Sequence, residues 1–92
     1  MKLHFKRRAL RHLEQIHDHI AKDNPAAAKR VIARIRHAIG RLSILPMSGR
    51  KGVVEGTRLL AVPDVSYIVV HRVRADTVEI IAVLHTARQR RN

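Results

Sequence analysis

The fold of this 92-residue chain is set by the stretch 65–85, which reads VSYIVVHRV, then RAD, then TVEIIAVLH. Two runs rich in β-branched residues that flank a short polar segment are typical of a β-hairpin. We therefore predict strands over residues 65–73 and 77–84, joined by a turn at 74–77.

This turn fixes which residues oppose one another across the hairpin. The expected pairs are Val73 with Val78, Arg72 with Glu79, and Val70 with Ile81. Side chains alternate between the two faces of a strand. One face should carry Tyr67, Val69, His71 and Val73 opposite Leu84, Ala82, Ile80 and Val78. The other should carry Ile68, Val70 and Arg72 opposite Val83, Ile81 and Glu79. A helical layer can cover one face, and an apolar patch left on the other is typical of a partner surface.

The charge balance restricts the partners of this protein. The sequence has 19 Lys and Arg against 7 Asp and Glu, a formal net charge of +12. Such a surplus attracts nucleic acid, an acidic protein, or both. The chain has no cysteine, which excludes disulfides and thiolate metal sites. No apolar run reaches the length of a membrane span, and no signal peptide is recognisable, so we expect a cytoplasmic protein with a single domain over residues 1–92.

The remaining elements follow from the periodicity of apolar residues. Residues 2–5 alternate as a short strand does, and residues 6–22 have the period of an amphipathic helix. Asn24 and Pro25 are typical of the start of a second helix, which we expect to end at residue 42 or 45. A further strand is expected within 53–62, and the basic tail 85–92 is expected to fray.

These elements predict an α+β fold in the order β-α-α-β-β-β. The short link between the helices makes them antiparallel. We expect the two antiparallel helices to pack on one face of a mostly antiparallel β-sheet.

Five segments in this order resemble the ParE/RelE superfamily of toxins from type II toxin-antitoxin modules. They are Asn24-Pro25-Ala26-Ala27-Ala28; Leu45-Pro46 with Ser48-Gly49-Arg50; Gly56-Thr57-Arg58-Leu59-Leu60; Tyr67-Ile68-Val69-Val70-His71-Arg72-Val73; and Val78-Glu79-Ile80-Ile81 followed by Val83-Leu84-His85. The resemblance spans nearly the whole chain. It implies two antiparallel helices on an antiparallel sheet, and an acidic antitoxin that binds and neutralises the toxin in a hetero-oligomer. The residues expected to bind the antitoxin or the target are Arg50, Arg58, Ile68, Val70, Arg72, Ile81 and Val83.

The resemblance leaves two mechanisms open. RelE-like members are ribosome-dependent mRNA endonucleases, whereas ParE-like members inhibit DNA gyrase. Cleaving RNA without a metal requires cations around the phosphate and a group that transfers protons. Candidate cations are Arg50, Lys51, Arg58 and Arg72, and the candidate acid or base is His85.

Two positions favour the ParE-like mechanism. Nuclease-like members typically have Arg directly after the aromatic residue that opens the third strand, whereas this chain has Ile68 after Tyr67. The basic residue expected two places beyond Arg58 is replaced by Leu60. We therefore expect gyrase inhibition without catalytic residues. If the chain is an enzyme instead, we expect a metal-independent endoribonuclease that uses Arg58, Arg72 and His85.

Structural roles compete with these functional ones. Arg58 could pair with a carboxylate, Arg72 with Glu79, and His85 could be an ordinary surface histidine. The helix histidines include no pair at i, i+4, so we expect no metal and no cofactor. A third hypothesis makes the basic helix faces a small DNA-binding module. The scarcity of aromatic residues argues against single-strand recognition.

Overall fold

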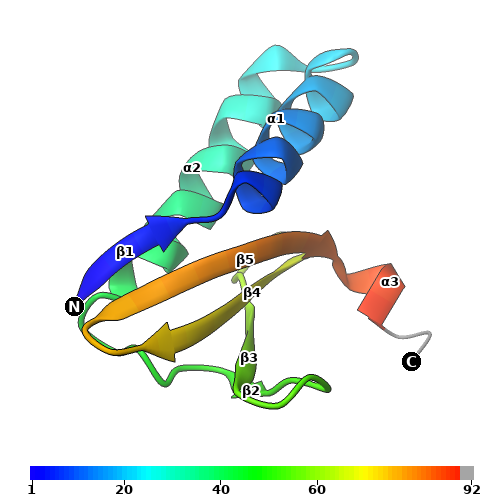
Figure 1. Ribbon diagram of the computed structural model, residues 1–92. Helices are drawn as coiled ribbons and strands as arrows, with labels where there is room; N and C mark the ends of the chain where they lie inside the picture. Colours follow the sequence, from blue (N-terminus) through cyan, green and yellow to red (C-terminus); the bar gives the residue numbers. More distant parts are fainter. Residues whose placement is uncertain (90–92) are drawn as a thin grey trace.

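The protein has the predicted order of elements with two short additions (Figure 1). A computed structural model describes residues 1–89. The elements are β1 (Lys2–Phe5), α1 (Arg7–Ala21), α2 (Pro25–Arg41), β2 (Arg50–Lys51), β3 (Thr57–Ala61), β4 (Tyr67–Arg74), β5 (Thr77–His85) and α3 (Thr86–Gln89). β3 lies within the segment 53–62 in which a strand was predicted, whereas β2 precedes that segment and was not predicted. The helix α3 occupies part of the tail that was expected to fray. Residues 90–92 of that tail lie outside the described part.

The five strands form one sheet in the order β1-β5-β4-β3-β2. β1 runs parallel to β5, and the other neighbours are antiparallel. The predicted mostly antiparallel sheet is therefore confirmed. In residues 1–89 no helix is both long and apolar enough to cross a bilayer.

The two long helices form the predicted antiparallel hairpin on one side of the sheet (Figure 1). The Asn24 side chain accepts a hydrogen bond from the backbone N–H of Ala27 (3.0 Å), and Pro25 occupies the first turn. Apolar residues from both helices and from the sheet form one core. It contains Ala9, Leu13, Ile16, Ile35, Ala38, Ile39, Leu42, Val62, Val69, Val78, Ile80 and Val83. The face of the sheet that carries Val69 and Ile80 therefore points to the helices.

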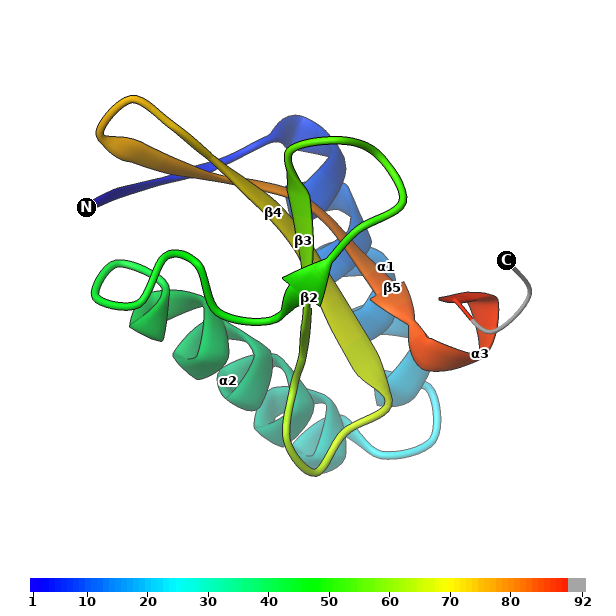
Figure 2. The same cartoon turned by 90° about the horizontal axis from the view of Figure 1, so that it is seen from below.

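The opposite side of the sheet is called the outer face (Figure 2). Its residues are the strand neighbours of the core residues. They are Thr57 and Leu59 on β3, Ile68, Val70 and Arg72 on β4, and Glu79, Ala82 and Leu84 on β5.

The predicted hairpin register is correct only near the turn. Val73 pairs with Val78 and Arg72 with Glu79, as expected, but Val70 pairs with Ala82 rather than with Ile81. The register shifts between Val70 and His71, so β5 contains one extra residue, a β-bulge.

The bulge changes the faces assigned to the end of β5. Val83 was predicted on the outer face, but it is 3 % exposed and belongs to the helix-facing core. Leu84 and Ala82 move to the outer face in its place, because one inserted residue reverses the alternation. Ile68 lies on the outer face as predicted, but it is only 5 % exposed. Neither Ile68 nor Val83 is therefore an open contact surface.

Candidate functional site

The structure does not bring the three nuclease candidates together. Arg58 lies on the helix-facing side of β3, where its Nη1–H donates to the carbonyl oxygen of Gly49 (3.0 Å). Arg72 lies on the outer face of β4. His85 pairs with Tyr67, which is five residues from Arg72 along the strand, about 17 Å at the usual rise. No common phosphate could contact all three side chains.

Arg72 is held in an ion-pair cluster at the hairpin end of the outer face. Its Nε–H donates to Oε1 of Glu79 (2.6 Å), which confirms the predicted pairing. The Lys6 ammonium lies 3.2 Å from the other oxygen of Glu79, and Nε of Arg74 lies 4.0 Å from Oε1. The hydrogen bond from Arg72, followed by that from Lys6, lowers the pKa of Glu79 to about 2, although burial acts in the opposite direction. Glu79 therefore neutralises Arg72.

This cluster predicts how stability depends on pH. The pKa of Glu79 falls from 4.5 to about 2 on folding, so its charge stabilises the folded protein above pH 4.5. That stabilisation is lost as the pH falls from 4.5 toward 2. We expect the Glu79→Gln variant to melt at a lower temperature than the parent at pH 7. The two melting temperatures should converge toward pH 2, as followed by circular dichroism.

A second carboxylate provides the control for this measurement. Asp76 forms an exposed pair with Lys2 (3.8 Å), so Asp76→Asn should change the melting temperature little at any pH. If the gap between parent and Glu79→Gln stayed constant down to pH 2.5, ionisation of Glu79 could not be its cause.

A buried histidine anchors the loop before β2. The Nε2–H of His71 donates to the carbonyl oxygen of Ser48 (3.1 Å), and Nδ1 is buried without a partner in the described part of the chain. Burial lowers the pKa of His71, and nearby Arg58 lowers it further against the opposing effect of the Ser48 hydrogen bond. His71 is therefore neutral at pH 7. Together with Arg58 it ties the Ser48–Gly49 backbone to the sheet, a structural role for both side chains.

A hollow of about 340 Å³ on the outer face forms the first candidate binding site, called the outer hollow. Its lining residues are Arg8, Val53, Val54, Thr57, Leu59, Val70, Arg72, Ile81, Ala82 and Leu84. Three of the predicted binding residues, Val70, Arg72 and Ile81, thus line one surface. Arg50 is exposed on β2, opposite Leu59 in the register, but is not part of this lining.

Two exposed valines form part of this hollow. Val53 is 88 % exposed and Val54 is 68 % exposed, on the loop between β2 and β3. Apolar side chains left this open beside a half-buried apolar surface are typical of a protein-binding site. The only cations in the lining, among described residues, are Arg8 and Arg72, and Arg72 is already paired. The outer hollow is therefore suited to an apolar partner with some acidic groups.

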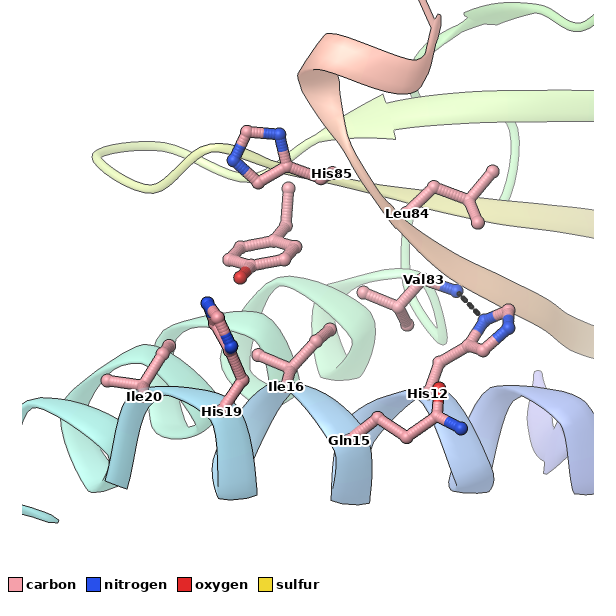
Figure 3. A pocket seen from close by; sticks show the side chains of 9 residues that line it. His12, Gln15, Ile16, His19, Ile20, Val83, Leu84 and His85 are labelled. Carbon is pink, nitrogen blue, oxygen red and sulfur yellow. Dashed lines mark hydrogen bonds between the residues drawn. The ribbon is translucent and has the colours of Figure 1, made fainter. Parts of the chain in front are cut away.

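A pocket of about 500 Å³ between α1 and β5 is the second candidate site (Figure 3). Its lining residues are His12, Gln15, Ile16, His19, Ile20, Tyr67, Val83, Leu84 and His85. The backbone N–H of Val83 donates to Nδ1 of His12 (3.1 Å), and that of Ala87 donates to Nδ1 of His85 (3.1 Å). The rings of Tyr67 and His85 meet edge to face, with centroids 5.3 Å apart.

The described lining of this pocket does not include the cations that RNA cleavage needs. Among the lining residues that the structure describes none is Lys or Arg, so no cation of that lining could stabilise a phosphorane beside His85. In residues 1–89 no group of three His, Asp or Glu side chains could hold a metal ion. The contacts of His85 in the described structure are the hydrogen bond from Ala87 and the edge-to-face packing against Tyr67.

Of the ten residues that line the outer hollow, sequence reasoning assigned three, Val70, Arg72 and Ile81, and missed the other seven. Arg8, Val53 and Val54 lie far from β4 in the chain and were not assigned to any site. The only signal for the valines was their position between two glycines in a loop, where apolar residues are out of place.

The chain is similar in sequence to a protein family and to named toxins. Residues 3–90 match the family model described as "ParE toxin of type II toxin-antitoxin system, parDE". Y4kP of Sinorhizobium fredii, named as a candidate toxin, is 46 % identical over 82 residues, which cover 89 % of this chain and 84 % of the relative. Toxin RelE2 of Caulobacter vibrioides is 33 % identical over 81 residues, covering 88 % and 90 %.

A solved structure has the same fold. The chain superimposes on a protein of the chromosomal ParDE toxin-antitoxin system from P. aeruginosa with a TM-score of 0.83, covering 92 % of this chain and 95 % of that one. The two share 24 % sequence identity, so the similarity concerns the fold.

Proposed function

This chain belongs to the ParE toxin family of type II toxin-antitoxin systems, and on that premise we propose that it arrests bacterial growth by inhibiting DNA gyrase. The family implies a cognate antitoxin as its partner. We propose that the toxin acts in the cytoplasm as a binding protein without catalysis, and that the antitoxin prevents this binding.

One observation carries the choice of gyrase over mRNA. Arg72 lies on the opposite face of the sheet from Arg58, and His85 lies beside Tyr67 at the other end of β4 from Arg72. Each already has a partner within the fold: Gly49 for Arg58, Glu79 for Arg72 and Ala87 for His85. A phosphoryl-transfer site needs unpaired donors that converge on one group. A protein in which Arg58 and Arg72 are both committed to partners within the fold is better suited to inhibition by binding.

We further propose that the antitoxin occupies the outer hollow. The hollow offers apolar contacts from Val54, Val70 and Ile81, with Arg8 at one side. A chain with a formal charge of +12 favours an acidic partner. A partly disordered antitoxin segment that orders on this surface would stabilise the toxin by mass action.

The order in which DNA and protein synthesis fall tests the target. We expect pulse labelling, in the first minutes after the chain is induced without antitoxin, to show that thymidine incorporation falls before methionine incorporation. Purified toxin should then block supercoiling by gyrase in vitro. The His85→Gln variant, which retains size and hydrogen bonding, should inhibit as the parent does.

The opposite order identifies the alternative mechanism. If methionine incorporation fell first and His85→Gln abolished the effect, the toxin would be a ribosome-dependent mRNA endonuclease and its acid or base would be His85. Co-expression of the antitoxin should remove both effects, which controls for the burden of expressing a basic protein.

A further inference from the structure

The exposed side of α2 carries a row of basic side chains, which we call the basic stripe: Arg30, Arg34, His37 and Arg41. At 3.6 residues per turn these positions fall within about 60° of one another around the helix. Arg36 lies apart, because its guanidinium stacks on the ring of Phe5 at 5.7 Å. The stripe from Arg30 to Arg41 is about 16 Å long, at 1.5 Å per residue.

No carboxylate on α2 offsets this stripe. The helix reads PAAAKRVIARIRHAIGR and contains neither Asp nor Glu. α1, by contrast, contains Glu14 and Asp18 in addition to its arginines. Among the described residues, the one acid paired with the stripe is Asp64, 3.0 Å from Arg34 in a pair whose side chains are more than half exposed. An exposed pair of this kind is weak and is easily exchanged for another anion.

The surface beside the stripe is open and has few groups that could anchor a protein. A hollow of about 500 Å³ runs along it, lined by Ala33, Arg34, His37, Ala38, Arg41 and Pro63. None of these is a large apolar or aromatic residue. Protein interfaces depend on buried aromatic or aliphatic anchors, and the nearest exposed large apolar side chains, Ile44, Leu45 and Met47, lie beyond the end of α2 rather than along the stripe. Figure 2 shows α2 at the edge of the molecule, where a long partner could lie against it.

We propose that the basic stripe of α2 binds the phosphate backbone of duplex DNA without reading its sequence. The spacing of the basic side chains, their exposure and the absence of acidic residues on α2 favour a polyanionic ligand. Because α2 has no Phe, Tyr or Trp on which bases could stack, its sequence argues against single-stranded nucleic acid. A helix fits the wide major groove of B-form DNA, whereas the A-form groove of duplex RNA is too narrow. This binding is separate from gyrase inhibition and does not rest on it.

The salt dependence of DNA binding tests this proposal. Each phosphate contact contributes about 0.9 to the slope of log K against log salt concentration. The triple variant Arg30→Gln, Arg34→Gln, Arg41→Gln should therefore lose about 2.7 from the slope measured by anisotropy with a labelled 20-base-pair duplex. Between 50 and 200 mM salt the parent should lose about 40-fold more affinity than this variant.

A control with the same net charge separates local contacts from overall charge. Arg7→Gln, Arg11→Gln, Lys22→Gln also removes three cations from the formal +12, but from α1 and its end. We expect this control to keep nearly the parent slope. The double variant Arg30→Gln, Arg41→Gln leaves the Arg34–Asp64 pair intact and should lose about 1.8, so a folding defect in the triple variant would not obscure the result.

Three outcomes would overturn the proposal. The first is equal slopes for the α2 and α1 variants, which would mean that only net charge matters. The second is tighter binding of single-stranded DNA or duplex RNA than of duplex DNA. The third is binding of labelled polyglutamate, but not DNA, in a manner that the α2 substitutions abolish, because the stripe would then bind an acidic protein.

Discussion

We expect the Gly49→Ala substitution to destabilise the folded protein by about 2 to 4 kcal/mol. Gly49 has a φ of +92°, a conformation that costs an alanine free energy, and an added Cβ would overlap the backbone carbonyl of Leu59. The carbonyl of Leu59 belongs to β3, so relief requires the loop to leave the sheet. The free energy of unfolding, measured in urea, should fall accordingly.

A second glycine gives the matched control. Gly40 lies in α2, where an added Cβ would meet nothing within 4 Å, so Gly40→Ala should raise stability by roughly 0.5 to 1 kcal/mol. Opposite signs for the same chemical change would show that the position of Gly49 is what matters. If Gly49→Ala were neutral, the Ser48–Gly49 loop would not be fixed to β3 in solution.

The same loop explains why Arg58 and His71 could not be assigned from sequence. Both side chains are partnered by backbone carbonyls of residues 48 and 49, which precede them in the chain by 9 and 23 residues. A strand pattern predicts on which face a side chain lies, but not which loop returns to cover it. Arg72, whose partner is directly across the hairpin, was predictable for the opposite reason.

The hairpin shows where the strand pattern no longer predicts the pairing register of β4 and β5. Its turn and the first pairs beyond it follow from the polar residues at 74–77 and from the opposite charges of Arg72 and Glu79. Beyond Ile80 the sequence is apolar on both strands, so an inserted residue leaves no polar marker. The bulge at this point places Val83 on the helix-facing side of the sheet and Leu84 on the outer face, opposite to the prediction.

The helices were predicted closely because their signals are local. Asn24 and Pro25 fix the start of α2, and its apolar period fixes the buried side. The outer hollow, in contrast, combines residues from α1, the β2–β3 loop and three strands. Only Val70, Ile81 and Arg72 of that set could be proposed from the sequence, because they belong to one hairpin.

We expect the Val70→Glu substitution to weaken binding of the cognate antitoxin about 100-fold, equivalent to about 2.7 kcal/mol. Val70 is half-buried at the centre of the outer hollow, between Leu59 and Ala82 in the register. A carboxylate there removes an apolar contact and repels an acidic partner. Isothermal titration calorimetry with the purified antitoxin measures the loss directly.

The choice of position determines whether this experiment is informative. Ile68→Glu, which also lies on the outer face, would bury a charge at a site that is 5 % exposed and would confound binding with unfolding. Val73→Glu is the better control, because Val73 is 36 % exposed and lies outside the outer hollow, and it should bind the antitoxin as the parent does. Equal affinities for Val70→Glu and the parent, with both proteins folded, would place the antitoxin elsewhere. The exposed valines 53 and 54 would then need another partner, and the gyrase target would be the first to test, because an apolar loop this open is costly to leave in water.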